Sequence, residues 1–170
     1  MLLKRLTGLL CIVILAFSLV ACGQDDSADQ TPEKTEEAVS TPTAAVKMET
    51  ITVFTIDAST MSILPSRVKK NQDDDSLSYL VQLVLDNLED DEIGIVNVAQ
   101  NEDKAIVEFD STKKPVTGCD EEMEDLILEC FANSILDNAE GVHSVIFRTE
   151  KGAYKSKYKT MKEDEEYASR

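Results

Sequence analysis

The amino-acid sequence predicts an α+β domain in which two helices pack on one face of a largely antiparallel sheet. Two segments place apolar residues three and four positions apart, the spacing of a helix with one buried side. Short runs rich in β-branched residues, which favour strands, lie before, between and after them. The predicted order is β-β-α-β-β-α-β-β, and a sheet with both helices on one face would bury both apolar stripes.

Two extended segments open the predicted domain. Residues 49–56 are rich in Ile, Val and Thr and indicate a strand that is buried on both faces. Residues 61–68 form a second extended segment, but Pro65 interrupts it. Because proline has no backbone N–H to donate, this segment is predicted to be an edge or irregular strand.

The first predicted helix follows residues 73–76, whose sequence is Asp-Asp-Asp-Ser. These residues offer an N-cap and place negative charge at the positive end of the helix dipole. A hairpin comes next, with strands at residues 95–98 and 105–109 and a turn at 101–104. The buried stripe of the helix is expected to contain Leu77, Leu80, Val81, Val84 and Leu88.

The second predicted helix begins near Asp120, and Gly141 is well placed to end it. Residues 142–148 then indicate a strand, residues 151–152 a turn, and residues 154–158 a short exposed strand. The apolar side of the helix is expected to contain Met123, Leu126, Ile127, Cys130, Phe131 and Ile135.

The composition excludes several classes of function. The chain has 170 residues, with 17 Lys and Arg against 33 Asp and Glu, and a net charge of -16. Such a surface disfavours nucleic acid, because affinity for phosphate backbones comes from clustered basic residues. The chain has one histidine, and histidine is the usual general base and metal ligand near neutral pH. We therefore expect no enzyme.

Residues 1–21 indicate a secretory signal peptide, with Lys4 and Arg5 followed by an uncharged run. The sequence Leu-Val-Ala-Cys that ends at Cys22 resembles the bacterial lipobox, which implies cleavage between Ala21 and Cys22 and attachment of diacylglycerol and acyl chains, such as palmitate, to Cys22. Two acyl chains hold a protein stably on a membrane. We expect a lipoprotein at the extracytoplasmic face of the cell membrane, with no cofactor besides this lipid. The alternatives are an ordinary cleavage site or an uncleaved membrane helix.

The remaining chain is predicted to divide into three parts. Residues 22–48 are polar and almost without large apolar side chains, so they are expected to form a disordered tether behind the lipidated cysteine. Residues 49–160 hold the folded domain, and residues 161–170 are expected to form a solvated polar tail. Removal of residues 1–21 would leave 15 basic and 33 acidic residues, a net charge of -18.

Six parts of the predicted domain match the pattern of a known family. They are residues 52–54, 80–84, 105–109, 133–136 and 141–147, with Gly152 after the last turn. In these segments the domain resembles the GerMN domain of bacterial spore germination and sporulation proteins. The resemblance implies a non-enzymatic module for interaction or assembly in the cell envelope, similar in shape to the ring-building domains of secretion and sporulation complexes. It also implies a role in sporulation or germination.

No catalytic residue and no metal site are predicted. His143 precedes Ser144, but neighbouring residues of a strand point to opposite faces and do not pair. An EF-hand aligned on its glycine would place Ile93 at a ligand position. Cys119 and Cys130 would lie about 16 Å apart in one continuous helix, beyond the limit of about 7 Å, so no disulfide is expected.

The leading hypothesis is a membrane-anchored interaction module for another envelope protein, with the partner left unidentified. Its contact surface is expected at an exposed sheet edge or on the acidic helix face of Glu122, Glu129 and Asp137. The rival hypothesis is a lipoprotein that binds a solute or a cell-wall polysaccharide in a pocket with aromatic platforms. An enzyme acting on peptidoglycan would need a carboxylate pair, and no spacing in the sequence indicates one.

Overall fold

Two long antiparallel strands begin the part of the chain described by the structure, a computed structural model that describes residues 46–88, 92–115 and 120–170. β1 (Met48–Asp57) and β2 (Ser62–Asn71) pair along their whole length and form a sheet of their own. Pro65 therefore lies in an edge strand, as predicted. The prediction that this first strand is buried on both faces is wrong, because only Val53 is fully buried there and a two-stranded sheet has one covered face.

α1 (Leu77–Leu88) confirms the first predicted helix. Its first turn is closed by Ser76, whose Oγ accepts a hydrogen bond from the backbone N–H of Tyr79 at 3.3 Å. Asp74 Oδ1 in turn accepts from the backbone N–H of Ser76 at 3.0 Å, which fixes the approach of the chain. The fully buried residues of the helix are Leu80, Val81 and Val84.

α2 (Glu121–Asn138) confirms the second helix, and Asp120 is its N-cap, accepting from Met123 N at 3.0 Å. The chain leaves the helix at Ala139 and turns at Gly141, whose φ of +72° is a conformation that favours glycine. The buried side of α2 comprises Glu124, Ile127, Leu128, Cys130, Phe131, Ala132, Ser134 and Ile135.

The second sheet has five strands. β3 (Ile95–Asn101) and β4 (Lys104–Phe109) form the predicted hairpin. β4 lies parallel to β5 (Ser144–Thr149), since α2 carries the chain back between them. The order is β3-β4-β5, and the other side of β5 pairs with β6 (Gly152–Ala153) and β7 (Glu166–Ser169).

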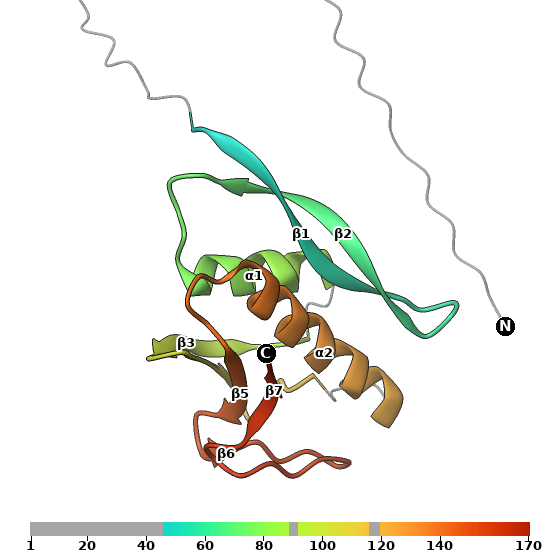
Figure 1. Ribbon diagram of the computed structural model, residues 1–170. Helices are drawn as coiled ribbons and strands as arrows, with labels where there is room; N and C mark the ends of the chain where they lie inside the picture. The colour runs from blue at the N-terminus through green and yellow to red at the C-terminus, as the bar shows by residue number, and fades with distance from the viewer. Residues whose placement is uncertain (1–45, 89–91, 116–119) are drawn as a thin grey trace, which may run out of the picture. The chain divides into compact units, whose positions relative to one another are not determined.

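The two helices lie between the two sheets, as Figure 1 shows. The predicted α+β class and the largely antiparallel pairing are confirmed, but the strands divide between two sheets instead of joining in one. β1 is bonded to α2: Phe54 N donates to Ser134 Oγ at 2.9 Å, and Asn138 Nδ2 donates to Thr52 O at 2.8 Å. The hairpin β1–β2 therefore covers the side of α2 that faces away from the larger sheet.

Aromatic rings fill the core between the helices and the larger sheet. The ring of Phe109 lies 5.8 Å from that of Phe131, 5.7 Å from Phe147 and 6.0 Å from Tyr154. All four side chains are fully buried. Strands β4 and β5, helix α2 and the segment after β6 are thus joined in one core.

The C-terminal segment differs from the prediction. Residues 154–158 form no regular strand, only a single bridge between Lys155 and Thr160, and Tyr154 is fully buried. Residues 161–170 are not a solvated tail, because β7 pairs with β5 and the ring of Tyr167 lies 5.0 Å from that of Phe147. The apolar residues there are too few to give a recognisable strand pattern, and the domain extends to the end of the chain.

Candidate functional site

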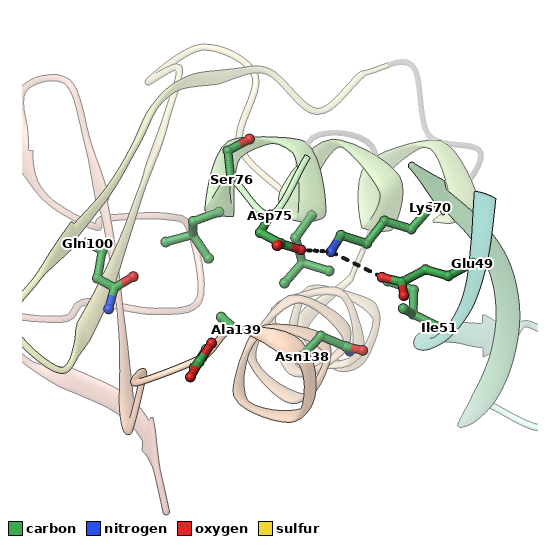
Figure 2. Close-up of a pocket in the computed structure, with 11 residues that line it drawn as sticks. Glu49, Ile51, Lys70, Asp75, Ser76, Gln100, Asn138 and Ala139 are labelled. Atoms are coloured by element: carbon green, nitrogen blue, oxygen red, sulfur yellow. Dashed lines mark hydrogen bonds and ion pairs between the residues drawn. The ribbon is translucent and has the colours of Figure 1, made fainter. Parts of the chain in front are cut away.

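A pocket of about 310 Å³ lies where the end of the β1–β2 sheet meets the start of α1 and the end of α2. Figure 2 shows Lys70 in its wall, with Gln100 on the opposite side and Asn138 and Ala139 below. Its lining residues are Glu49, Ile51, Lys70, Asp75, Ser76, Leu77, Leu80, Gln100, Asn138, Ala139 and Glu140.

Lys70 is the central charge of this pocket. Its side chain is 12% exposed, and its Nζ pairs with Asp75 Oδ1 and lies 3.4 Å from Glu49 Oε1. The hydrogen bond to Asp75 raises the pKa of the Lys70 ammonium, and the bond to Glu49 adds to this. The side chain therefore stays protonated near neutral pH and is unsuited to act as a base or a nucleophile.

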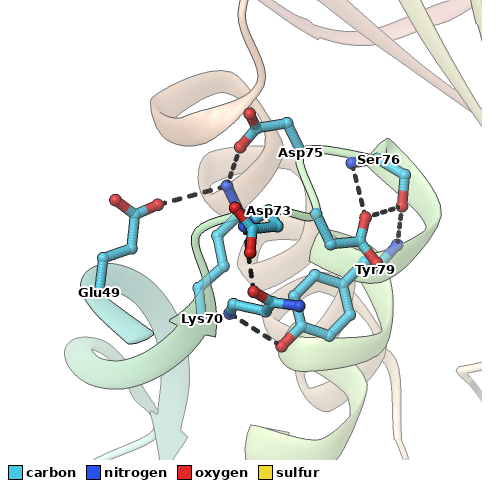
Figure 3. Close-up of polar contacts among 8 residues, drawn as sticks. Glu49, Lys70, Asp73, Asp75, Ser76 and Tyr79 are labelled. Carbon is cyan, nitrogen blue, oxygen red and sulfur yellow. Dashed lines mark hydrogen bonds and ion pairs between the residues drawn. The ribbon is translucent and has the colours of Figure 1, made fainter. Parts of the chain in front are cut away.

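The neighbouring polar groups hold the connection between β2 and α1, as Figure 3 shows. Tyr79 OH accepts from the backbone N–H of Asn71 at 3.2 Å, and Asn71 Oδ1 accepts from Asp73 N at 3.0 Å. The hydrogen bond from the Ser76 hydroxyl lowers the pKa of Asp74. These groups bond to one another, so their evident role is to fix the loop.

The pocket can admit a small polar group, but its chemistry is limited. Among the described lining residues none is aromatic, histidine or cysteine, and the ammonium of Lys70 already bonds two carboxylates. A bound ligand would have to compete with Glu49 or Asp75 for Lys70. The hydroxyl of Ser76, which also lines the pocket, donates to Asp74 Oδ1 at 2.6 Å.

A second hollow, of about 390 Å³, runs between α1 and β3. We call it the α1–β3 groove. Val96 in its wall is 56% exposed, which is the highest exposure of any large apolar residue in β3. The described residues that line it are Ser78, Val81, Gln82, Ile95, Val96, Asn97 and Val98.

The predicted processing site lies outside the described residues. The structure does not describe residues 1–45, which contain the predicted signal peptide with Ala21, the lipidated Cys22 and most of the predicted tether. Lipidation of Cys22 therefore stays a prediction. No helix among residues 46–88, 92–115 and 120–170 is long and apolar enough to cross a membrane.

His143 and Ser144 do not form a catalytic pair. His143 is exposed just before β5, and its backbone N–H donates to Asp103 O at 2.6 Å. Ser144 is buried, with no hydrogen-bond partner for its Oγ. Within the described ranges, no group of three or more His, Cys, Asp or Glu side chains could hold a metal ion.

Cys130 is a free thiol and is fully buried in α2. Burial, with a smaller contribution from the charge of Glu129, raises its pKa to about 12. Because the thiolate is the reactive species, this cysteine is chemically inert in the folded domain. Cys119 lies outside the described residues.

The acidic face of α2 is partly occupied by the C-terminal segment. Glu122 and Glu129 are exposed as expected, but Asp137 pairs with Arg170. Asp125 also pairs with Lys159. The three residues predicted as a contact surface therefore do not form one free acidic patch.

Two features escaped the sequence analysis. Lys70 gave no signal, since its partners come from a distant strand and a loop. Glu124 did give one, because it lies three residues before Ile127 on the apolar side of the second helix. Its carboxylate is fully buried and accepts from Tyr154 OH at 2.6 Å and Ser156 Oγ at 3.0 Å.

Comparisons of the chain with protein-family models, curated proteins and solved structures found no match. The function is therefore argued from the sequence and the geometry of the domain alone.

Proposed function

We propose that this chain is a lipoprotein anchored through Cys22 at the extracytoplasmic face of the cell membrane. Its domain acts as a non-catalytic interaction or assembly module for another envelope protein. The resemblance to GerMN domains favours a place in sporulation or germination. The observation that supports an interaction module is the uncharged edge strand β3 with the α1–β3 groove beside it, in a chain whose full sequence has a net charge of -16.

The absence of a competing chemistry among the described residues supports this reading. Lys70 in the pocket is bonded to Glu49 and Asp75, and Cys130 is buried beyond the reach of a substrate. An interaction module needs only a stable domain with an available surface. The aromatic core stabilises the domain, and the edge strand β3 offers the available surface.

Lipid labelling tests the anchor. Cells given an alkyne-bearing palmitate should label the wild-type chain at mature size, and Cys22→Ser should lose both the label and membrane attachment. Cys11→Ser, which changes a cysteine inside the leader, is the matched control and should keep both. A labelled, membrane-bound Cys22→Ser product of mature size would contradict the anchor.

Crosslinking in intact cells tests the module. Photoreactive side chains at several exposed positions of the domain should recover a protein partner from at least one of them. Recovery of only lipid or glycan at every position would contradict an interaction module.

The rival function is binding of a solute or a cell-wall polysaccharide, and the Lys70 pocket is the observation in its favour. It predicts that soluble peptidoglycan fragments shift the amide resonances of Gln100 and Glu140, which line the pocket. Such shifts, together with no recovered protein partner, would replace the proposed function with this one.

A further inference from the structure

β3 is an edge strand bordered by a groove. Within the residues that the structure describes it pairs only with β4, so the backbone N–H and C=O groups along its other side have no strand partner. The α1–β3 groove runs along that strand, with α1 as its other wall. An extended peptide adds as a further strand in an arrangement of this kind, where main-chain bonds give affinity and a groove takes the side chains.

The edge lacks the residues that usually prevent such pairing. Edge strands are commonly protected by Lys or Pro, and β3 (Ile-Val-Asn-Val-Ala-Gln-Asn) has no proline and no charged residue. Its one protective feature is a bulge between Ile95 and Asn97, which interrupts the register with β4. Val98–Asn101 remains a regular stretch beyond the bulge.

Charge selects the kind of partner. α1 and β3 together carry one acid, Asp86, and no Lys or Arg. Gln82, which lines the groove, donates to Asp86 Oδ1 at 2.6 Å, so this acid lies one turn of α1 beyond a lining residue. A second copy of the processed chain would bring another net charge of -18, from 15 basic and 33 acidic residues, against the first, and like charges oppose association. A basic segment meets no such opposition.

We infer that the α1–β3 groove binds an extended segment of another protein that bears Lys or Arg and adds to β3 as a strand. This inference rests on the proposed function and names the surface that carries it. The same charge argument disfavours the acidic residues 22–45 of this chain as the occupant.

The test uses the chain from Gly23 to Arg170 and synthetic peptides of alternating valine and threonine. One peptide carries lysine at both ends, a second carries glutamate, and a third carries lysine with a central proline. The lysine peptide should shift the amides of Ser78, Gln82 and β3 in nuclear magnetic resonance spectra and should slow hydrogen exchange in β3. The glutamate and proline peptides should bind at least about tenfold more weakly.

Two variants locate the binding surface. Val96→Lys adds a cation at the groove and should weaken binding of the lysine peptide about tenfold. Leu64→Lys makes the same change at another exposed apolar residue, on β2, and should leave binding unchanged. Equal binding of the lysine and glutamate peptides, shifts centred on the Lys70 pocket, or loss of binding only in Leu64→Lys would overturn the inference.

Two further outcomes separate the inference from the proposed function. Shifts of β3 that grow with protein concentration without peptide would make a second copy the occupant and overturn the inference. If peptides fail while crosslinking in cells recovers a protein partner through Leu64, the groove assignment is wrong and the interaction module stands.

Discussion

The buried hydroxyl of Tyr154 gives the sharpest test of how this domain is held together. Tyr154 and Glu124 are both fully buried, and the hydroxyl donates to Glu124 Oε1 over 2.6 Å. Tyr154→Phe removes this bond but keeps the ring that packs 6.0 Å from Phe109. The substitution therefore removes the hydroxyl and its bond to Glu124 and keeps the aromatic ring in the core.

The expected loss follows from the bond type. Removal of one partner of a buried hydrogen bond costs about 1–3 kcal/mol, and Ser156 Oγ would remain bonded to Glu124 Oε2 at 3.0 Å. We expect the free energy of unfolding to fall by about 2 kcal/mol. For a domain of about 120 residues, the unfolding entropy makes this a fall in Tm of about 8 °C.

Urea and thermal unfolding of the chain from Gly23 to Arg170 measure the effect. Tyr158→Phe is the matched control, because the Tyr158 hydroxyl accepts from Lys157 Nζ at 3.1 Å in an exposed contact. That control should stay within about 0.5 kcal/mol of wild type. If Tyr154→Phe is no less stable than Tyr158→Phe, the buried carboxylate does not hold the C-terminal segment on α2.

Three other predictions follow from the same structure. Cys130 should react with iodoacetamide at pH 8 only as fast as the domain unfolds, since it is buried with a pKa of about 12; rapid alkylation without denaturant would contradict its burial. Deleting residues 166–170 removes β7 and the partly buried ring of Tyr167, and should lower the free energy of unfolding in urea titrations by about 2–3 kcal/mol. If these residues were only a solvated tail, their deletion would leave the stability unchanged. Hydrogen bonds from Ser76 and Ser111 lower the pKa values of Asp74 and Glu150, so the folded state binds fewer protons than the unfolded state. The free energy of unfolding should stay constant above about pH 5 and fall as the pH drops through the folded pKa values, and a rise on acidification would refute this sign.

The sequence was sufficient for elements whose pattern is local. Both helices could be placed because apolar residues recur every three or four positions and because Ser76 and Asp120 are recognisable caps. The hairpin of β3 and β4 was equally local. The fold class followed from these elements, since their apolar stripes need a sheet to cover them.

Contacts between residues far apart in the chain could not be predicted from local sequence patterns. That β1 and β2 form a separate sheet depends on side chains of α2 such as Ser134, which bonds to Phe54 N some 80 residues away. β7 was missed because its burial rests on Tyr167, one aromatic residue in a charged segment. The Lys70 pocket was missed for a similar reason, since Glu49 and Asp75 meet only after folding.

Ionic strength should separate the structural and functional roles of charge. The exposed pairs between α2 and the C-terminal segment, such as Arg170 with Asp137, contribute at most about 1 kcal/mol each and are screened by salt. The bond between Tyr154 and Glu124 is buried and escapes this screening. The domain should therefore lose little stability at high salt, whereas attraction of a basic segment to the α1–β3 groove should weaken, because it acts through solvent. A domain that unfolds at the salt concentration that releases the lysine peptide would show that surface pairs, not Glu124 and the aromatic core, hold it together.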